Sequence, residues 1–478
     1  MKAVTSNPLA QDLLRRIDGS TVRSGVIGLG YVGLPLAVAL ARGGATVVGL
    51  DIDTRKVDAI ARGVSYISDV ESEEVAELVV AGRLRATSDF SALASLDTVN
   101  ICVPTPLRKT KDPDVSYMVA AVERVADHLH PGMLVILEST TYPGTTEELV
   151  QPLLEATGLV AGRDFFLAFS PERVDPGNPE FNTTNVPKVV GGLTETCAAL
   201  AAALYERSID RVVTVKSTKA AEMVKLLENT FRAVNIGLVN EIAMMCDTLG
   251  IDVWEVVEAA ATKPFGFMPF YPGPGLGGHC IPIDPFYLSW KAKQNGFEAR
   301  FIELAGQVNG HMPQYVVSKV ADALNGKRKA LNGARVLVLG VAYKRDVDDL
   351  RESPALDVMK TLKEKGADVA YSDPHVPALD GSLWDSPHSL HSLELDARTL
   401  DQFDCTVIVT DHQAFDYELI LAHSDCVVDA RNALGHRYAP SVVRLGAPLP
   451  RPMQSPVERK ASQLSATQSQ VGDIQRVA

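Results

Sequence analysis

Closely spaced cysteines are missing from this sequence of 478 residues. No CxxC pair occurs, and the six cysteines stand singly at positions 102, 197, 246, 280, 405 and 426. Zinc ribbons and disulfide scaffolds need cysteines at short, regular spacing, so neither is indicated and no metal is predicted. Isolated thiols suit a reducing compartment, and we expect a cytoplasmic protein.

A long hydrophobic run is also missing. The most apolar stretch, VIGLGYVGLPLAVALA from Val26, is interrupted by three glycines and a proline before it could span a bilayer. The first twenty residues lack the apolar core of a signal peptide. We therefore expect neither membrane insertion nor a targeting signal.

The chain has no excess of positive charge. It carries 46 Lys and Arg against 59 Asp and Glu, a formal net charge of −13. Proteins that bind nucleic acids or membrane surfaces usually present a basic face, so neither partner is predicted. The composition, 46% hydrophobic and 22% charged, is that of a globular protein, and the length favours two to three domains.

Strands and helices alternate along the first part of the chain. Short apolar runs at 24–28, 45–53, 98–103, 133–140 and 164–170 are separated by amphipathic stretches of helical length. This alternation predicts an α/β fold with a doubly wound parallel sheet.

Proline is absent from residues 216–262, which carry apolar residues at helical spacing. A second helical stretch covers about 301–326, so the middle of the chain is predicted to be helical. Because long helices of this kind commonly carry a dimer interface, we expect a homodimer or a higher homo-oligomer.

The opening pattern returns near the C-terminus. A predicted strand at 334–344 is followed by a helix and by GADVAYSD, which ends at Asp373 as GATVVGLD ends at Asp51. The sequence thus predicts two related α/β domains joined by helices. The expected boundaries are 1–20 for an extension, 21–214 and 329–448 for the α/β domains, 215–328 for the helical region, and 449–478 for a disordered tail rich in Ser, Gln and Pro.

The segment GLGYVG places Gly28, Gly30 and Gly33 in GxGxxG spacing after a predicted strand and before a helix, with Asp51 ending the next strand. Such glycines let the backbone approach a pyrophosphate, and the acid accepts the ribose hydroxyls. Since an acid repels a 2′-phosphate, NAD is predicted as the cofactor rather than NADP.

The second α/β domain keeps only Gly340 of this fingerprint and inserts YKRDVDDLRES. Lys344, Arg345 and Arg351 in the insertion can pair with phosphates through charge-assisted hydrogen bonds. A solvated charged turn explains the segment equally well.

Cys280 lies in GPGLGGHCIPIDPFY, where four glycines precede it. A lone cysteine is most often a buried packing residue, but these glycines favour close approach of the backbone to a ligand. A thiolate suits a dehydrogenase that carries an aldehyde on to an acid: it forms a thiohemiacetal, loss of hydride gives a thioester, and water releases the product. His279 beside it does not indicate a metal, because adjacent residues rarely chelate one ion.

Eight motifs, in order, resemble those of the UDP-glucose/UDP-N-acetylmannosamine dehydrogenase family of nucleotide-sugar 6-dehydrogenases. The resemblance runs from about residue 20 to 440, and its motifs are GLGYVGLPLA, VPTPL, ESTTYPGTT, SPERVDPGN, VKLLENTF, GPGLGGHCIPIDPFYLSWKA, NGHMPQYVV and VLGVAYKRDVDDLRESPA. It implies two Rossmann-like domains, the first binding NAD and the second UDP, joined by a helical dimerisation region.

The resemblance also implies catalytic roles. Cys280 is the nucleophile, and Lys225 and Asn229, on one helix face, hold a water or the oxyanion at carbon six. Asp284 acts with Lys225 and a water as the base of the first oxidation. Glu172 activates water for thioester hydrolysis.

Further contacts follow from the same resemblance. Thr140 lies by the nicotinamide, and the remaining cofactor contacts come from Tyr31, Val32, Arg55 and Thr105. The substrate contacts, beyond Glu172, Lys225 and Asn229, come from Arg173, Tyr271, Gly277, His279, Lys344 and Arg351.

The sugar of the substrate is indicated by one difference between this sequence and the motif of the UDP-glucose enzymes. UDP-glucose enzymes of the family read roughly GGSCxPKD, whereas this chain has His279 and Ile283 at the differing positions. The segment is most similar to UDP-N-acetylglucosamine 6-dehydrogenases. UDP-N-acetylmannosamine and then UDP-glucose are the alternative substrates, and surface polysaccharide synthesis is the process that we expect the enzyme to serve. Two other classes stay open: a non-catalytic nucleotide-binding scaffold and a two-electron hydroxyacid dehydrogenase.

Overall fold

The computed structural model describes residues 7–448 except 68, 108–111, 176, 179, 279, 385–387, 436 and 438. The chain forms two compact units, one of Met1–Val234 with His279–Leu304 and one of Asn235–Gly278 with Ala305–Ala478. The predicted disordered tail, 449–478, and the side chain of His279 lie outside the described residues.

The first unit contains an eight-stranded sheet in the order β3-β2-β1-β4-β5-β6-β7-β8. Neighbouring strands are parallel except β6 and β7, which are antiparallel. The first six strands follow the order typical of dinucleotide-binding domains. The bounds are β1 Arg23–Ile27, β2 Thr46–Leu50, β3 Leu84–Thr87, β4 Thr98–Ile101, β5 Leu134–Leu137, β6 Phe166–Phe169, β7 Lys188–Gly192 and β8 Val212–Val215.

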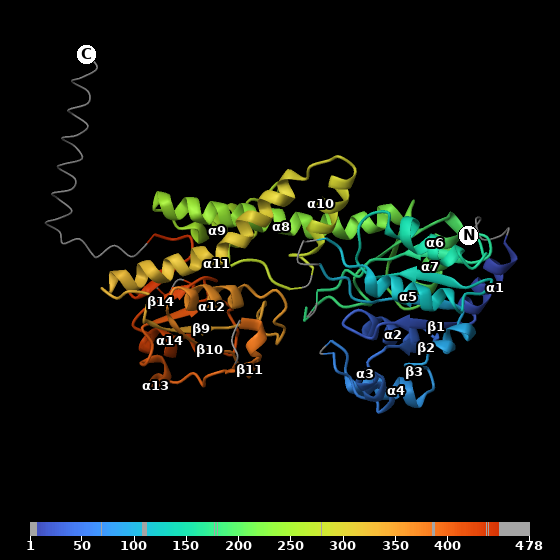
Figure 1. The fold of residues 1–478 in the computed structure, drawn as a ribbon, viewed down its shortest axis with the longest axis horizontal. Coiled ribbons are helices and arrows are strands. Elements are labelled where there is room, and N and C mark those ends of the chain that lie inside the picture. Colours follow the sequence, from blue (N-terminus) through green and yellow to red (C-terminus); the bar gives the residue numbers. More distant parts are fainter. Residues whose placement is uncertain are drawn as a thin grey trace, which may run out of the picture. The chain divides into compact units, whose positions relative to one another are not determined.

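Helices cover both faces of this sheet, as predicted (Figure 1). Alternate residues of one strand face opposite ways: Leu134 and Ile136 of β5 pack into one hydrophobic cluster, Val135 and Leu137 into the other. The first cluster is closed by α1 Pro8–Asp18, α2 Gly33–Arg42, α3 Thr54–Ala61, α4 Ser72–Val80 and α7 Glu195–Tyr205, and the second by η2 Phe90–Ser95, α5 Ser116–Ala126, η3 Thr146–Val150 and α6 Gln151–Glu155.

Long helices follow, and Figure 1 draws α8, Thr218–Leu249, as one continuous green helix. The helical stretch predicted over 216–262 is interrupted after α8, because Gly250 takes a positive φ of 73°. It resumes as α9, Val253–Ala261, capped by Asp252. The second predicted stretch is α11, Arg300–Gly326. The middle is not wholly helical, since described residues at 263–283 form loops before α10, Asp284–Gln294.

The second unit contains a parallel sheet in the order β10-β9-β13-β14-β15. Helix α12 and part of α11 pack on one face, and α13 and α14 on the other. This confirms the second doubly wound domain. Its elements are β9 Arg335–Leu339, α12 Pro354–Glu364, β10 Asp368–Ser372, β13 Cys405–Ile408, α13 Ala397–Leu400, α14 Tyr417–His423, β14 Val427–Asp429 and β15 Val442–Arg444, with β11 Ala378–Leu379, η4 Gly381–Trp384 and β12 Leu390–His391 between β10 and α13.

Within the described part of the chain, no helix combines the length and apolar character needed to cross a bilayer.

Candidate active site

The three fingerprint glycines meet different surroundings. Gly28 has a φ of 88°, and a Cβ there would lie 2.6 Å from the carbonyl oxygen of Cys102. A Cβ on Gly33 would lie 1.8 Å from the carbonyl oxygen of Gly28. Gly30 differs, because no described atom beyond its two chain neighbours lies within 4 Å of a Cβ built on it. Packing thus requires the first and third glycines, whereas the second borders open space that suits a pyrophosphate at the start of α2.

Asp51 is 6% exposed and held by three donors. Its Oδ2 accepts from the backbone N–H of Leu29 at 2.8 Å and from Lys56 Nζ at 3.0 Å, and its Oδ1 from the N–H of Asp53 at 2.9 Å. A carboxylate offers about four lone-pair positions. Lys56 must therefore move for Asp51 to accept both ribose hydroxyls.

Lys56 rather than Arg55 contacts this acid. The guanidinium of Arg55 pairs with Asp53 at 2.8 Å and the Arg55 side chain is 90% exposed. Arg55 was predicted to contact the cofactor and Lys56 was not, since two adjacent basic residues at a helix start carry no signal that distinguishes them.

Thr105 and Thr140 meet beyond the ends of β4 and β5. The hydroxyl of Thr105 donates to the carbonyl oxygen of Thr140 at 2.7 Å. The hydroxyl of Tyr287, on α10, donates to the carbonyl oxygen of Thr105 at 2.5 Å. The segment that follows Cys280 is thereby attached to the edge of the sheet where a dinucleotide would lie.

One pocket of the first unit joins the fingerprint to predicted catalytic residues. It brings together Tyr31, Val32, Glu172, Lys225 and Cys280, which all line it. The lining residues that the sequence analysis did not name are Pro35, Asp69, Val174, Asn178, Phe181, Asn182 and Thr183. A cofactor held by the fingerprint therefore lies within reach of the candidate nucleophile.

A tight turn joins Cys280 to Asp284. The backbone N–H groups of Ile283 and Asp284 donate to the carbonyl oxygen of Cys280 at 3.0 and 2.8 Å, and α10 begins at Asp284. Asp284 is 2% exposed, and its Oδ2 accepts from Asn229 Nδ2 of α8 at 2.5 Å. This turn brings the predicted nucleophile and base to one place.

The charges of this group support proton transfer. Burial raises the pKa of Asp284 to about 6, against the opposing effects of Lys225 and Asn229. Burial acts to lower the pKa of Lys225, but negative charge on Cys280, Asp284 and Glu172 outweighs it and the pKa is raised. A lysine cation near Cys280 favours the thiolate, the reactive form of cysteine.

Glu172 is anchored more firmly than Asp284. Its Oε1 accepts from the N–H groups of Arg173 and Val174 at 2.8 and 2.9 Å, and its Oε2 lies 3.2 Å from Lys188 Nζ. Burial acts to raise the pKa of Glu172, but Lys188 and these N–H groups prevail and the pKa is lowered. The side chain of Arg173 turns to Glu228, at 2.6 Å.

The predicted substrate contacts of the second unit lie around the loop before Cys280 and the turn after β9. Tyr271 stacks on Trp254 with ring centroids 6.3 Å apart. A Cβ on Gly277 would lie 2.6 Å from Tyr343 Cβ, and Lys344 follows in the turn. Arg351 pairs with Asp349 at 2.6 Å. In a separate ion pair, Arg345 contacts Asp411.

Among the described residues, one cluster has ligand spacing: the ligand atoms of Asp346, His375 and His412 lie within 4.8 Å of one another. Both ring nitrogens of His412 are engaged, Nε2 with Asp373 Oδ2 at 3.1 Å and Nδ1 with the N–H of Asp346 at 2.9 Å. The ring therefore ties the ends of β9, β10 and β13 together, and we assign it no metal.

Three family models match the chain in order. Residues 22–209 match the NAD binding domain of the UDP-glucose/GDP-mannose dehydrogenase family, 219–311 its central domain, and 337–436 its UDP binding domain.

Individual relatives agree with this match. The UDP-N-acetyl-D-glucosamine 6-dehydrogenase of Pseudomonas aeruginosa is 40% identical over 358 residues, 74% of this chain and 83% of the relative. The UDP-N-acetyl-D-mannosamine dehydrogenase of Pyrococcus horikoshii is 36% identical over 420 residues, 86% and 96% of the two chains. A solved structure of UDP-D-ManNAc dehydrogenase from Pyrococcus horikoshii superposes with a TM-score of 0.81 at 35% identity, covering 89% of this chain and 99% of that one.

Proposed function

This chain belongs to the UDP-glucose/GDP-mannose dehydrogenase family, as an NAD-dependent nucleotide-sugar dehydrogenase, and we propose that it oxidises the carbon-six hydroxyl of UDP-N-acetylglucosamine to a carboxylate. The observation that carries this proposal is the pocket shared by Cys280, Lys225, Glu172 and the fingerprint residues Tyr31 and Val32. An N-acetylated sugar is supported by the residues around Cys280 and by the relatives named above. The fingerprint glycines and Asp51 would hold NAD, and two molecules of NAD, bound in turn, would supply the hydride acceptors for the two oxidations.

The first oxidation needs a base for the carbon-six hydroxyl. Asp284, acting with Lys225 and a water, takes this proton. A carboxyl whose pKa is raised to about 6 is largely ionised at neutral pH and is a stronger base than an ordinary carboxylate. The short hydrogen bond from Asn229 fixes its orientation.

The second oxidation needs the thiolate. Cys280 attacks the aldehyde carbon, and the oxyanion that develops is stabilised by the Lys225 ammonium and the Asn229 amide. Loss of the second hydride leaves a thioester on Cys280. Water, activated by Glu172, then releases the uronic acid.

The UDP part of the substrate is assigned to the second unit. All strands of its sheet are parallel, but the order in which the chain adds them reverses between β9 and β13, and ligands of such sheets bind beyond the carboxyl ends of the strands at this point. Lys344, Arg345 and Arg351 follow β9. Since Arg345 and Arg351 each hold a carboxylate, phosphate binding would exchange these partners.

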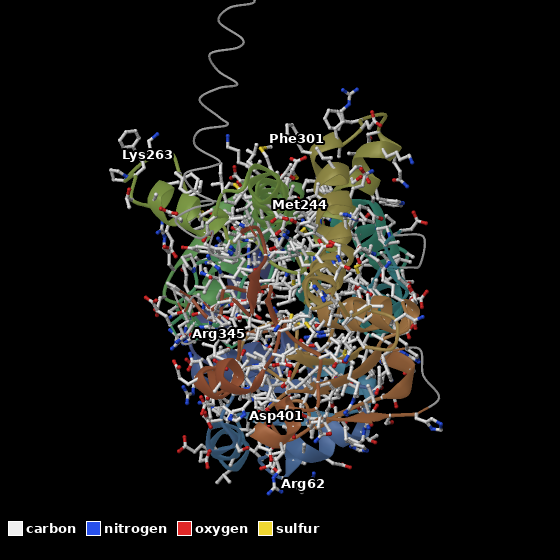
Figure 2. The ribbon with its side chains drawn as sticks, turned by 90° about the vertical axis from the view of Figure 1, so that its left-hand side faces the viewer. Arg62, Met244, Lys263, Phe301, Arg345 and Asp401 are labelled. Carbon is white, nitrogen blue, oxygen red and sulfur yellow. The ribbon has the colours of Figure 1, made fainter. Side chains whose placement is uncertain are left out.

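A second copy of the chain is proposed to cover α8. Four of its apolar residues, separated by eleven, seven and four positions, are at least half exposed: Leu227, Leu238, Met245 and Leu249. These spacings approximate multiples of the 3.6-residue turn and fall on one helix face. Phe301 at the start of α11, labelled in Figure 2, is 78% exposed. Exposed apolar side chains in such number suit a homodimer or a higher homo-oligomer.

None of the six cysteines, all of which lie in the described part of the chain, forms a disulfide, which supports the proposed reducing, cytoplasmic location.

The test offers UDP-N-acetylglucosamine, UDP-N-acetylmannosamine and UDP-glucose separately with NAD. We expect two NADH per acid and the highest kcat/KM with the first. A higher kcat/KM with UDP-N-acetylmannosamine or UDP-glucose would show that this sugar nucleotide, and not UDP-N-acetylglucosamine, is the substrate. One NADH per product would instead support a two-electron dehydrogenase, and no turnover a binding scaffold.

A further inference from the structure

Lys188, the first residue of β7, is a buried cation behind the site. It is 4% exposed, and its Nζ lies 2.7 Å from Glu138 Oε2 and 3.2 Å from Glu172 Oε2. Glu172 lines the pocket with Cys280, whereas Lys188 and Glu138 do not. The ammonium therefore connects a carboxylate of the site to one of the protein interior.

Glu138 fixes the position of this lysine. Its Oε1 accepts from Asn100 Nδ2 at 3.0 Å and from the hydroxyl of Tyr205. The ring of Tyr205 also lies 5.3 Å from Lys188 Nζ. Residues from β4, the end of β5 and α7 thus hold the ammonium in place.

The network determines which part of Glu172 can act. Two backbone N–H groups occupy Oε1, and Lys188 contacts Oε2. Of about four lone-pair positions, three are taken by described donors, and the fourth is on Oε2. A buried ion pair often adds little to the stability of a fold. Because this network ends at a reactive pocket, we look for its role in the reaction.

We propose that Lys188 is a positioning residue for thioester release, holding Glu172 with a single oxygen directed at the reacting water. The inference rests on the proposed role of Glu172. In this step the water oxygen bonds to the acyl carbon, one water proton passes to Glu172, and the carbon–sulfur bond breaks with Cys280 leaving as thiolate. No electrons pass to the cofactor, so the step is separable from both oxidations.

The charges around Glu172 give the sign of its pH dependence. The cations near it are Lys188 and Lys225. Against the effect of burial, negative charge on Cys280 and Asp284 raises the pKa of Lys225, and negative charge on Glu138 and Cys102 raises that of Lys188, so both lysines stay charged. Because Lys188 lowers the pKa of Glu172, its removal raises that pKa. The acidic limb of thioester release then moves to higher pH.

The experiment compares Lys188→Met with the wild type and with Lys219→Met. Lys219 is a control lysine on α8 whose side chain is half exposed and pairs with Glu147. Lys188→Met leaves two buried carboxylates without their cation and can therefore fail to fold. The double variant Lys188→Met/Glu138→Gln removes one charge of each sign and is used for the same measurement in that case. A single turnover with UDP-N-acetylglucosamine and NAD reports NADH, acyl-enzyme and acid separately.

In Lys188→Met we expect two NADH per site to form at nearly the wild-type rate and acid release to slow about 10²-fold. The acidic limb of the pH profile of acid release should lie at higher pH than in the wild type. Acid release with unchanged rate and pH profile would overturn the inference, as would an equal loss of NADH formation and acid release, which indicates a structural role. If the wild type itself forms no acyl-enzyme, the proposed function fails and the inference with it.

Discussion

The side-chain amide of Asn229 donates to Asp284 Oδ2 over 2.5 Å, and both residues are buried. This bond joins α8 to α10 beside Lys225 and Cys280. Burial raises the pKa of the carboxyl to about 6 although a lysine and an amide oppose the shift. The protein thus keeps a carboxylate in an environment that favours its protonated form.

Asp284→Asn tests this base. The carboxylate acts only when ionised, so kcat/KM of the wild type is expected to fall below about pH 6. The variant should lose about 10²- to 10⁴-fold in kcat, the usual contribution of a general base. Initial rates from pH 5 to 9 measure both; a wild-type profile that stays flat through pH 6 would contradict the role.

The same variant is expected to be more stable than the wild type at pH 7. The folded-state pKa of Asp284 lies above its unfolded value, so ionisation destabilises the fold above pH 6 and this cost disappears below about pH 4. The gain in free energy of unfolding is on the order of 2 kcal/mol. Urea unfolding at pH 7.5 and 4.5 should show the full difference at the higher pH and a clearly smaller one at pH 4.5.

Lys225→Met should act on both rate and pH profile. The variant loses a cation from the developing oxyanion, which costs about 10²- to 10³-fold in kcat. Since Lys225 lowers the pKa of Asp284, the acidic limb should also move to higher pH. Lys219→Met on the same helix is the control and should change neither quantity.

Gly30→Ala and Gly33→Ala separate binding from packing. A Cβ on Gly33 collides with the backbone of Gly28, so this variant should lose thermal stability. No described atom opposes a Cβ on Gly30, so that variant should keep its stability but bind NAD less tightly. Melting temperature and NAD titration measure the two effects; equal NAD affinity in Gly30→Ala and the wild type would argue against a pyrophosphate there.

Leu238→Glu/Met245→Glu tests the exposed face of α8. Charges on a face covered by a second copy should dissociate the assembly, which sedimentation velocity detects as a smaller species. Val80→Glu, at an 89% exposed apolar residue that ends α4, is the control and should leave the mass unchanged. If the double variant sediments like the wild type, α8 is not the interface.

Most of the fold was predictable from the sequence. Strands β1, β2, β4, β5 and β6 are buried on both faces and therefore read as apolar runs. Strand β8 is only partly buried, and β7 begins with a lysine, a residue type rarely found in the interior. Neither β7 nor β8 was predicted, because a search for apolar runs does not detect a strand that is partly exposed or that begins with a charged residue.

The site was predictable to a similar extent. The sequence singled out Cys280 through the glycines around it, and through the family resemblance it implied Lys225 and Glu172; the structure gathers all three in one pocket. It did not identify Lys188 or Glu138, because they lie 50 residues apart and only the tertiary fold pairs them.

The most direct test of the account is mass spectrometry of Cys280 during turnover. In Glu172→Gln, with UDP-N-acetylglucosamine and NAD, the uronyl thioester should accumulate on the Cys280 peptide after two NADH have formed. An unmodified Cys280 peptide, while acid and two NADH still appear, would contradict the covalent mechanism.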